Sequence, residues 1–226
     1  MHEDPVHETG HEGERGVGAM RSGLDTAKVI RDKAAELFFE KGYDATTLRE
    51  VATAAGLKVG SLYNHIASKE DLLLQVMGGI IDDLVELQQQ ALGVEGDAVE
   101  RLRAVIECHM RFHAERARAV YIGNTNVRSL SEGPRAEIVA KRSAYERILE
   151  AQIEAAGDAG LVQLIDARLH AYSIVAQGFH VAGWYREGGR KSLDDIVADY
   201  TKIALRELKV VDADERVDVA RAPAEA

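Results

Sequence analysis

Two short helical segments joined by a tight turn restrict the fold of this chain more than any other feature of its sequence. Thr47 and Glu50 have the spacing of a capping box, in which a hydroxyl and a carboxylate each bind a backbone N–H group at the start of a helix. Gly56 ends the helix that follows, because glycine adopts the left-handed conformation of a helix C-terminus at little cost. A new apolar pattern with Leu62 and Ile66 begins three residues later. Two short helices joined in this way predict a helix-turn-helix.

A longer helix is expected before this motif, from about Ala27 to Lys41, with Gly42 as its end. Its apolar residues recur at helical spacing and form one face: Ile30, Ala34, Leu37 and Phe38. The three helices together predict a small helical domain over residues 24–70, and Ser68 is expected to cap the helix that follows it.

This segment is also the least acidic part of the chain. The net charge of the whole protein is −10, which by itself argues against binding to nucleic acid. Residues 1–20 carry one arginine against five acidic side chains, and residues 71–226 carry 19 basic against 26 acidic side chains. Residues 21–70 carry eight basic against seven acidic side chains. A DNA-binding surface is therefore expected here, with an acidic remainder that repels DNA.

Helical periodicity continues through the rest of the chain, with gaps marked by glycine and without the alternation typical of strands. The sequence predicts an all-α protein of about nine helices. A larger helical domain is expected over residues 71–209. Residues 1–23 and 210–226 lack a clear apolar face and are interpreted as disordered tails.

Composition bears on whether the protein forms disulfides, is secreted or enters a membrane. Cys108 is the single cysteine, so no intramolecular disulfide can form. The N-terminus is acidic and does not resemble a signal peptide. No apolar run approaches the roughly 20 residues that cross a bilayer, so we expect a cytoplasmic protein without a membrane partner.

Several separate blocks of the first domain resemble the TetR family of transcriptional regulators. The blocks are ATTLREVA at residues 45–52, AGL at 55–57, GSLYNHI at 60–66 and SKEDL at 68–72, preceded by AELF at 35–38 and KGY at 41–43. The resemblance implies a three-helix helix-turn-helix DNA-binding domain followed by a helical ligand-binding and dimerisation domain. It also implies a homodimer that binds double-stranded operator DNA.

The family pattern implies DNA contacts position by position. Thr47 and Lys69 would contact phosphates through the N-terminal ends of their helices. Tyr63 and His65 would reach the DNA backbone; the alternative is that these two side chains only pack within the helical unit. The remaining positions would face the groove: Arg49, Val59, Gly60, Ser61 and Asn64.

The same resemblance places a small-molecule pocket in the second domain, linked to the DNA-binding domain by a long helix over residues 69–90. The residues expected to line this pocket are Met110, Phe112, His113, Tyr121, Asn124 and Phe179. For each of them, ordinary core packing is the alternative interpretation. His109 and His113 share a helical face, but no third metal ligand accompanies them, so neither a metal site nor a cofactor is expected.

Two apolar helices, over residues 166–186 and 192–208, are expected to form the dimer interface. Its predicted residues are Tyr172, Trp184, Ile196 and Tyr200. The sequence WYREGG at residues 184–189 is similar to TetR-type regulators of fatty-acid, steroid and aromatic catabolism, many of which respond to acyl-CoA thioesters. The alternative is that Trp184 and Tyr185 only bury the interface.

These patterns predict a homodimeric repressor that binds a palindromic operator and is released by a small molecule, with an acyl-CoA thioester of lipid or steroid catabolism as the favoured class. The alternatives are a TetR-type repressor of an efflux pump that responds to hydrophobic drugs, and a DNA-binding dimer without a ligand. An all-α enzyme is a remote alternative. The chain has no GxSxG, Walker A, GxGxxG or HExxH motif, so no catalytic residue is predicted.

Overall fold

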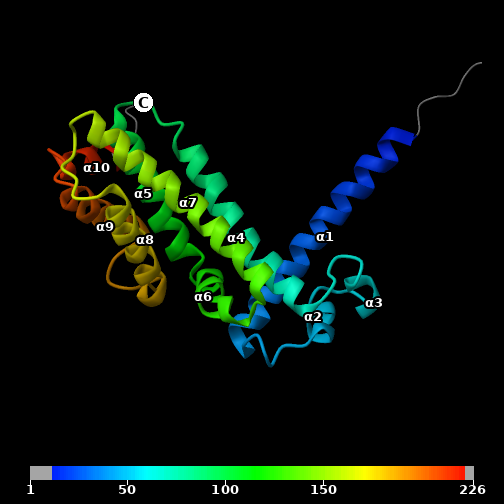
Figure 1. Ribbon diagram of the computed structural model, residues 1–226. Coiled ribbons are helices and arrows are strands. Elements are labelled where there is room, and N and C mark those ends of the chain that lie inside the picture. The colour runs from blue at the N-terminus through cyan, green and yellow to red at the C-terminus, as the bar shows by residue number, and fades with distance from the viewer. Residues whose placement is uncertain (1–11, 222–226) are drawn as a thin grey trace, which may run out of the picture. The chain divides into compact units, whose positions relative to one another are not determined.

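The computed structural model describes residues 12–221, with side chains from Thr26 to Ala220. In this range the chain forms ten α-helices and one 3₁₀ helix and contains no strand, which confirms the predicted all-α fold (Figure 1). The elements are α1 (Glu12–Lys41), α2 (Leu48–Ala54), α3 (Val59–Leu62), α4 (Lys69–Ala91), α5 (Ala98–Glu115), α6 (Ala117–Thr125), η1 (Asn126–Ser129), α7 (Glu132–Asp158), α8 (Ala167–Trp184), α9 (Leu193–Glu207) and α10 (Ala213–Arg221).

The chain divides into two compact units, Met1–Leu72 and Leu73–Ala226. The first unit contains α1, α2, α3 and the first turn of α4. Its core is made by side chains that are at most 3% exposed: Ile30, Ala34, Phe38, Thr46, Val51, Ala52, Leu62, Ile66 and Leu72. The expected apolar face of α1 is present, although Leu37 is only half-buried.

The second unit is built around α5, which packs against α7, α8 and α9 (Figure 1). A helix with neighbours on several sides needs apolar residues around most of its circumference. The sequence of α5 provides them, and its buried residues include Val99, Leu102, Ile106 and Met110. The elements α6 and α7 also pack against α8, so α5 and α8 together hold the unit.

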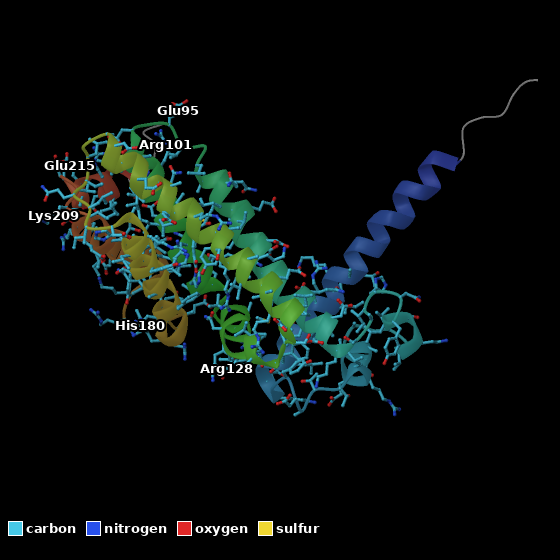
Figure 2. All side chains as sticks on the ribbon, in the orientation of Figure 1. Glu95, Arg101, Arg128, His180, Lys209 and Glu215 are labelled. Carbon is cyan, nitrogen blue, oxygen red and sulfur yellow. The ribbon has the colours of Figure 1, made fainter. Side chains whose placement is uncertain are left out.

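The C-terminal part of the chain differs from the predicted tail at residues 210–226. Residues 213–221 form α10, which packs against α9 and buries Ala213 and Val217. Arg216 of α10 forms ion pairs of 2.9 Å with both Asp97 and Glu100, at the start of α5. Figure 2 shows Glu95 and Arg101 at the same end of the second unit as Lys209 and Glu215. Ion pairing to a distant segment of the sequence therefore compensates for the small apolar surface of α10.

The N-terminal part of the chain differs as well, because α1 begins at Glu12 rather than near Ala27. Residues 1–11 and 222–226 of the two predicted tails lie outside the described residues, as do His2, His7 and His11.

Candidate nucleic-acid interface and candidate ligand cavity

The capping box predicted at the start of α2 is present. The Glu50 N–H donates to the Thr47 hydroxyl at 3.2 Å, and the Thr47 N–H donates to the Glu50 carboxylate at 2.8 Å. Lys41, at the end of α1, binds the other carboxylate oxygen at 2.8 Å. These bonds, led by that from Lys41, lower the pKa of Glu50 to about 2. The hydroxyl of Thr47 also donates to Glu50, so a phosphate contact from Thr47 would share the hydroxyl with this charge.

The tight turn after α2 depends on Gly56, which has a positive φ of 69°. A residue with a Cβ would be strained there, so glycine lets the chain reverse within a few residues. The following helix, α3, buries Leu62. Ile66, just beyond it, is also buried, so the opposite side of this segment faces outward.

That outward side carries the residues predicted to contact DNA. Val59 is 38% exposed and Tyr63 is 54% exposed. Gly60 and Asn64 are also exposed, and Ser61 and His65 are half-exposed. Tyr63, the residue that follows α3, is too exposed to contribute much to the core, which disfavours a purely structural role for it.

Lys69, at the start of α4, is held within the first unit. Its ammonium group donates to the Asp44 carbonyl at 3.0 Å and lies 4.5 Å from the centre of the Tyr43 ring. Ser68 accepts a hydrogen bond from the Asp71 N–H, so α4 begins with the predicted cap. Arg49 on α2 is exposed. The DNA contacts of Thr47, Arg49, Lys69 and the α3 segment remain predictions.

The second unit encloses a small cavity of about 30 Å³ between α4, α5, α6, α7 and α8. Its wall is mostly apolar, with Met77, Ile81 and Leu84 from α4 and Phe112 from α5. Arg142 and Tyr145 from α7 add polar groups. A largely apolar lining with a few polar anchors is typical of small-molecule sites.

Four of the six predicted pocket residues lie at this cavity: Phe112, His113, Asn124 and Phe179. The other two do not line it. Met110 is fully buried in the core, and Tyr121 is 55% exposed on α6. Helical periodicity shows that a residue is buried, but does not distinguish a core neighbour from a cavity wall.

Arg142 and Tyr145 are the functional candidates that sequence reasoning missed. They lie three residues apart on α7, and Arg142 donates to the Gly123 carbonyl and, at 3.4 Å, to the Asn124 side chain. Burial raises the pKa of the Tyr145 hydroxyl, which therefore stays protonated. An arginine about one helical turn before a tyrosine was the available sequence signal, but it does not show that the two residues meet α4 and α5.

His109 and His113 lie against one another on α5, with ring centres 4.0 Å apart and ring planes tilted by 46°. Burial lowers the pKa of His113 to about 4. Burial, and next the charge of His113, lowers the pKa of His109 well below its ordinary value. Both rings are therefore neutral at neutral pH. No group of three or more His, Cys, Asp or Glu side chains among the described residues is arranged to hold a metal ion.

Apolar side chains are exposed along α8 and α9, where the dimer interface was predicted. Tyr172 is 41% and Trp184 is 42% exposed, and the Trp184 ring lies 6.4 Å from that of half-buried Tyr200. Ile196 is only 6% exposed and belongs mainly to the core of its own protomer. Leu169 and Ile203, which are not among the predicted interface residues, are 62% and 48% exposed on the same two helices.

Two family models match this chain. Residues 30–76 match the model described as bacterial regulatory proteins of the tetR family, and residues 95–208 match a tetracyclin repressor-like C-terminal domain. No helix in the described part of the chain is long and apolar enough to cross a membrane.

Individual proteins agree with the family models. The chain is 30% identical over 181 residues to the HTH-type transcriptional repressor KstR2 of Rhodococcus jostii (strain RHA1), covering 78% of this chain and 87% of KstR2. A tetR-family regulatory protein from Rhodococcus RHA1 has a crystal structure that matches with a TM-score of 0.76 and 29% identity, over 83% of this chain and 98% of that one.

The crystal structure of AibR in complex with isovaleryl coenzyme A and operator DNA matches with a TM-score of 0.72 and 25% identity. The match covers 82% of this chain and 100% of the AibR chain. A helix-turn-helix unit and an all-helical second unit, each matched by its own model, show that the chain belongs to the TetR family of bacterial transcriptional regulators.

Proposed function

We propose that this protein is a homodimeric repressor that binds a palindromic operator and releases it when a small-molecule effector enters the second unit. The main support for this proposal is the outward surface of α3 and of the residues that follow it. Val59, Tyr63 and Asn64 are exposed there, while Leu62 and Ile66 anchor the segment. A short helix held from behind, with its outer side free, is the part of a helix-turn-helix that enters the major groove.

We propose α8 and α9 as the dimer interface. Leu169, Tyr172, Trp184 and Ile203 expose apolar surface on these two helices. Neighbouring apolar side chains on the surface of a regulator are more stable when another protein surface covers them. A two-fold dimer would present two α3 helices to the two halves of a palindrome.

An acyl-CoA thioester is our proposed effector class. The crystal structure of AibR with isovaleryl coenzyme A and operator DNA supports it, as does the apolar lining of the cavity with Arg142 beside it. A cavity of about 30 Å³ is close to the size of one water molecule, so an acyl group must push its walls apart.

The helix α4 provides a route from effector to DNA. Its first turn belongs to the first unit, and Met77, Ile81 and Leu84 border the cavity. An acyl group that displaces these side chains favours a different position of α4. Such a ligand binds the DNA-free conformation more tightly and so lowers operator affinity.

The DNA-binding proposal is tested by titrating the protein against the DNA upstream of its own gene at several salt concentrations. We expect affinity well above that for scrambled DNA, falling steeply with salt. Tyr63→Ala should weaken binding by about tenfold, the effect of losing one charge-assisted contact. Tyr121→Ala is a matched control, because Tyr121 is equally exposed but lies on α6. Equal affinity for upstream and scrambled DNA would refute the proposal.

The effector class is tested by adding isovaleryl-CoA, decanoyl-CoA, free CoA, decanoic acid and a hydrophobic cationic dye to the protein–operator complex. Release by a CoA thioester, but not by free CoA or decanoic acid, is the expected result. Release by the dye alone would instead support the efflux-pump alternative, which the apolar cavity lining also favours. Release by none of them would remove the acyl-CoA class and leave the DNA-binding proposal intact.

A further inference from the structure

Two fully buried side chains of the second unit, Gln88 on α4 and His109 on α5, carry polar atoms that have no hydrogen-bond partner. Gln88 is fully buried, and neither its amide nitrogen nor its amide oxygen has a partner. Gln88 lies one helical turn beyond Leu84, on the face of α4 that borders the cavity. A buried amide without partners is costly, so this position needs an explanation beyond packing.

The second unpaired group is on α5. His109 is fully buried, and its Nδ1 has no hydrogen-bond partner. Its Nε2 lies 3.3 Å from the Val175 carbonyl, which can only accept, so Nε2 carries the proton. In a neutral ring Nδ1 is then a bare acceptor.

His113, one turn along α5, presents a second bare acceptor. Its Nδ1 lies 2.8 Å from the His109 carbonyl and therefore carries the proton of the neutral ring. Its Nε2 is left as an acceptor, and His113 lines the cavity. The backbone thus fixes the tautomers of both rings, and both free nitrogens require a donor.

These groups lie toward the same end of the cavity. The helices α4 and α5 are joined by a short loop, and Asp83 of α4 pairs with Arg116 at the end of α5, so the two helices run antiparallel. Moving from Leu84 to Gln88 and from His113 to His109 therefore leads in the same direction, toward the loop. At this end the protein offers one amide donor, one amide acceptor and two imidazole acceptors.

A hydroxyl group fits this set of partners. It can donate its proton to an imidazole nitrogen while its oxygen accepts from the Gln88 amide. A ketone oxygen can accept from the amide but leaves both imidazoles unpaired. A carboxylate would place negative charge against the lone pairs of neutral imidazoles.

We infer that the effector carries a hydroxyl group that is bound by His113, with Gln88 and His109 beside it, while the apolar cavity holds its hydrocarbon part. This inference rests on the proposed acyl-CoA effector and adds the hydroxylated acyl chain as its class. Arg142 borders the same cavity and is the donor available to a carbonyl oxygen of that ligand.

The test compares the affinities of the full-length protein for four CoA esters by isothermal titration: decanoyl-CoA, 3-hydroxydecanoyl-CoA, 10-hydroxydecanoyl-CoA and 3-oxodecanoyl-CoA. We expect at least one hydroxylated ester to bind about fivefold more tightly than decanoyl-CoA, the effect of one net hydrogen bond. The 3-oxo ester should show no such gain. If neither hydroxylated ester exceeds decanoyl-CoA, the inference is wrong while the proposed function stands. If no ester binds, the inference and the proposed acyl-CoA class both fail, while the DNA-binding proposal stands.

Variants of His113 test whether this side chain causes the preference for a hydroxylated ester. His113→Leu should remove the gain from the hydroxyl, and His113→Gln, which keeps an acceptor, should retain part of it. Met110→Leu is the matched control, because Met110 is equally buried on α5 but does not line the cavity. Nitrogen-15 spectra of the histidines give a readout that does not depend on folding differences: the hydroxylated ester should shift the bare Nε2 of His113 upfield. A hydroxyl preference that persists in His113→Leu, or an unmoved Nε2 signal, would overturn the assignment.

Discussion

Gly178 shows how one missing side chain sets the distance between two helices. A Cβ at this position of α8 would collide with the His109 ring on α5, coming within 2.7 Å of its Cδ2 and closer still to Nε2. The absence of a Cβ therefore permits the close approach of α5 and α8 and the bond from His109 to the Val175 carbonyl.

Gly178→Ala should lower the free energy of unfolding by about 1–3 kcal/mol, because the His109 ring cannot move without disturbing a packed core. Urea denaturation measures the change. Gly183→Ala on the same helix is the control, since no atom lies within 4 Å of an added Cβ there. In the double variant with His109→Ala, the added cost of Gly178→Ala should largely vanish. If the double variant instead loses the sum of the stabilities lost by the two single variants, the clash with the His109 ring is not the cause.

The buried histidines make stability depend on pH. The pKa of His113 is about 4 in the folded protein and 6.5 in an unfolded chain, so between these values the unfolded state binds a proton that the folded state does not. The free energy of unfolding therefore falls as the pH falls through this window, by about 2–3 kcal/mol between pH 7.5 and 4.5 from His113 alone.

His113→Gln should lose that share of the pH dependence, as measured by urea denaturation of both proteins at pH 7.5 and 4.5. The contributions of the carboxylates remain in both proteins and cancel in the comparison, whereas that of His109 changes only through the lost charge of His113. If the two proteins lose equal stability on acidification, His113 is not held neutral by burial.

At the scale of elements, features that depend on neighbouring residues could be predicted from the sequence. Features that depend on contacts between distant residues could not. The caps at Thr47 and Ser68 and the turn at Gly56 depend on residues within a few positions, and all three were predicted from sequence. The cavity wall formed by Arg142 depends on how α7 meets α5 and α6. The helix α10 depends on ion pairs of Arg216 with residues more than one hundred positions away. Neither relation leaves a periodic pattern.

Arg216→Ala should therefore release α10. We expect a loss of about 1–2 kcal/mol in the free energy of unfolding, because the ion pairs of Arg216 with Asp97 and Glu100 disappear. Arg206→Ala is the control, since Arg206 also joins α9 to α10, through Asp214, but is 61% exposed. It should cost clearly less than Arg216→Ala, because solvent screens an exposed ion pair. Hydrogen exchange of the α10 amides should rise in Arg216→Ala, and unchanged protection would contradict the role of this ion pair.

At the scale of the whole molecule, the two units differ in charge as their proposed roles require. Residues 21–70 are nearly neutral, whereas residues 71–226 carry 19 basic against 26 acidic side chains. An acidic body disfavours nonspecific contact with DNA, so binding must come from the limited surface around α3. A small surface of this kind holds DNA firmly only when two copies act together.

Dimerisation should therefore be separable from folding and necessary for operator binding. Leu169→Asp combined with Ile203→Asp places two charges in the proposed interface on α8 and α9, where both side chains are exposed in one protomer. We expect a folded monomer in sedimentation experiments and a loss of operator affinity of about 100-fold or more. Val139→Asp is the control, because Val139 is 52% exposed on α7, outside the proposed interface. A double variant that remains a dimer with full operator affinity would place the interface elsewhere on the second unit.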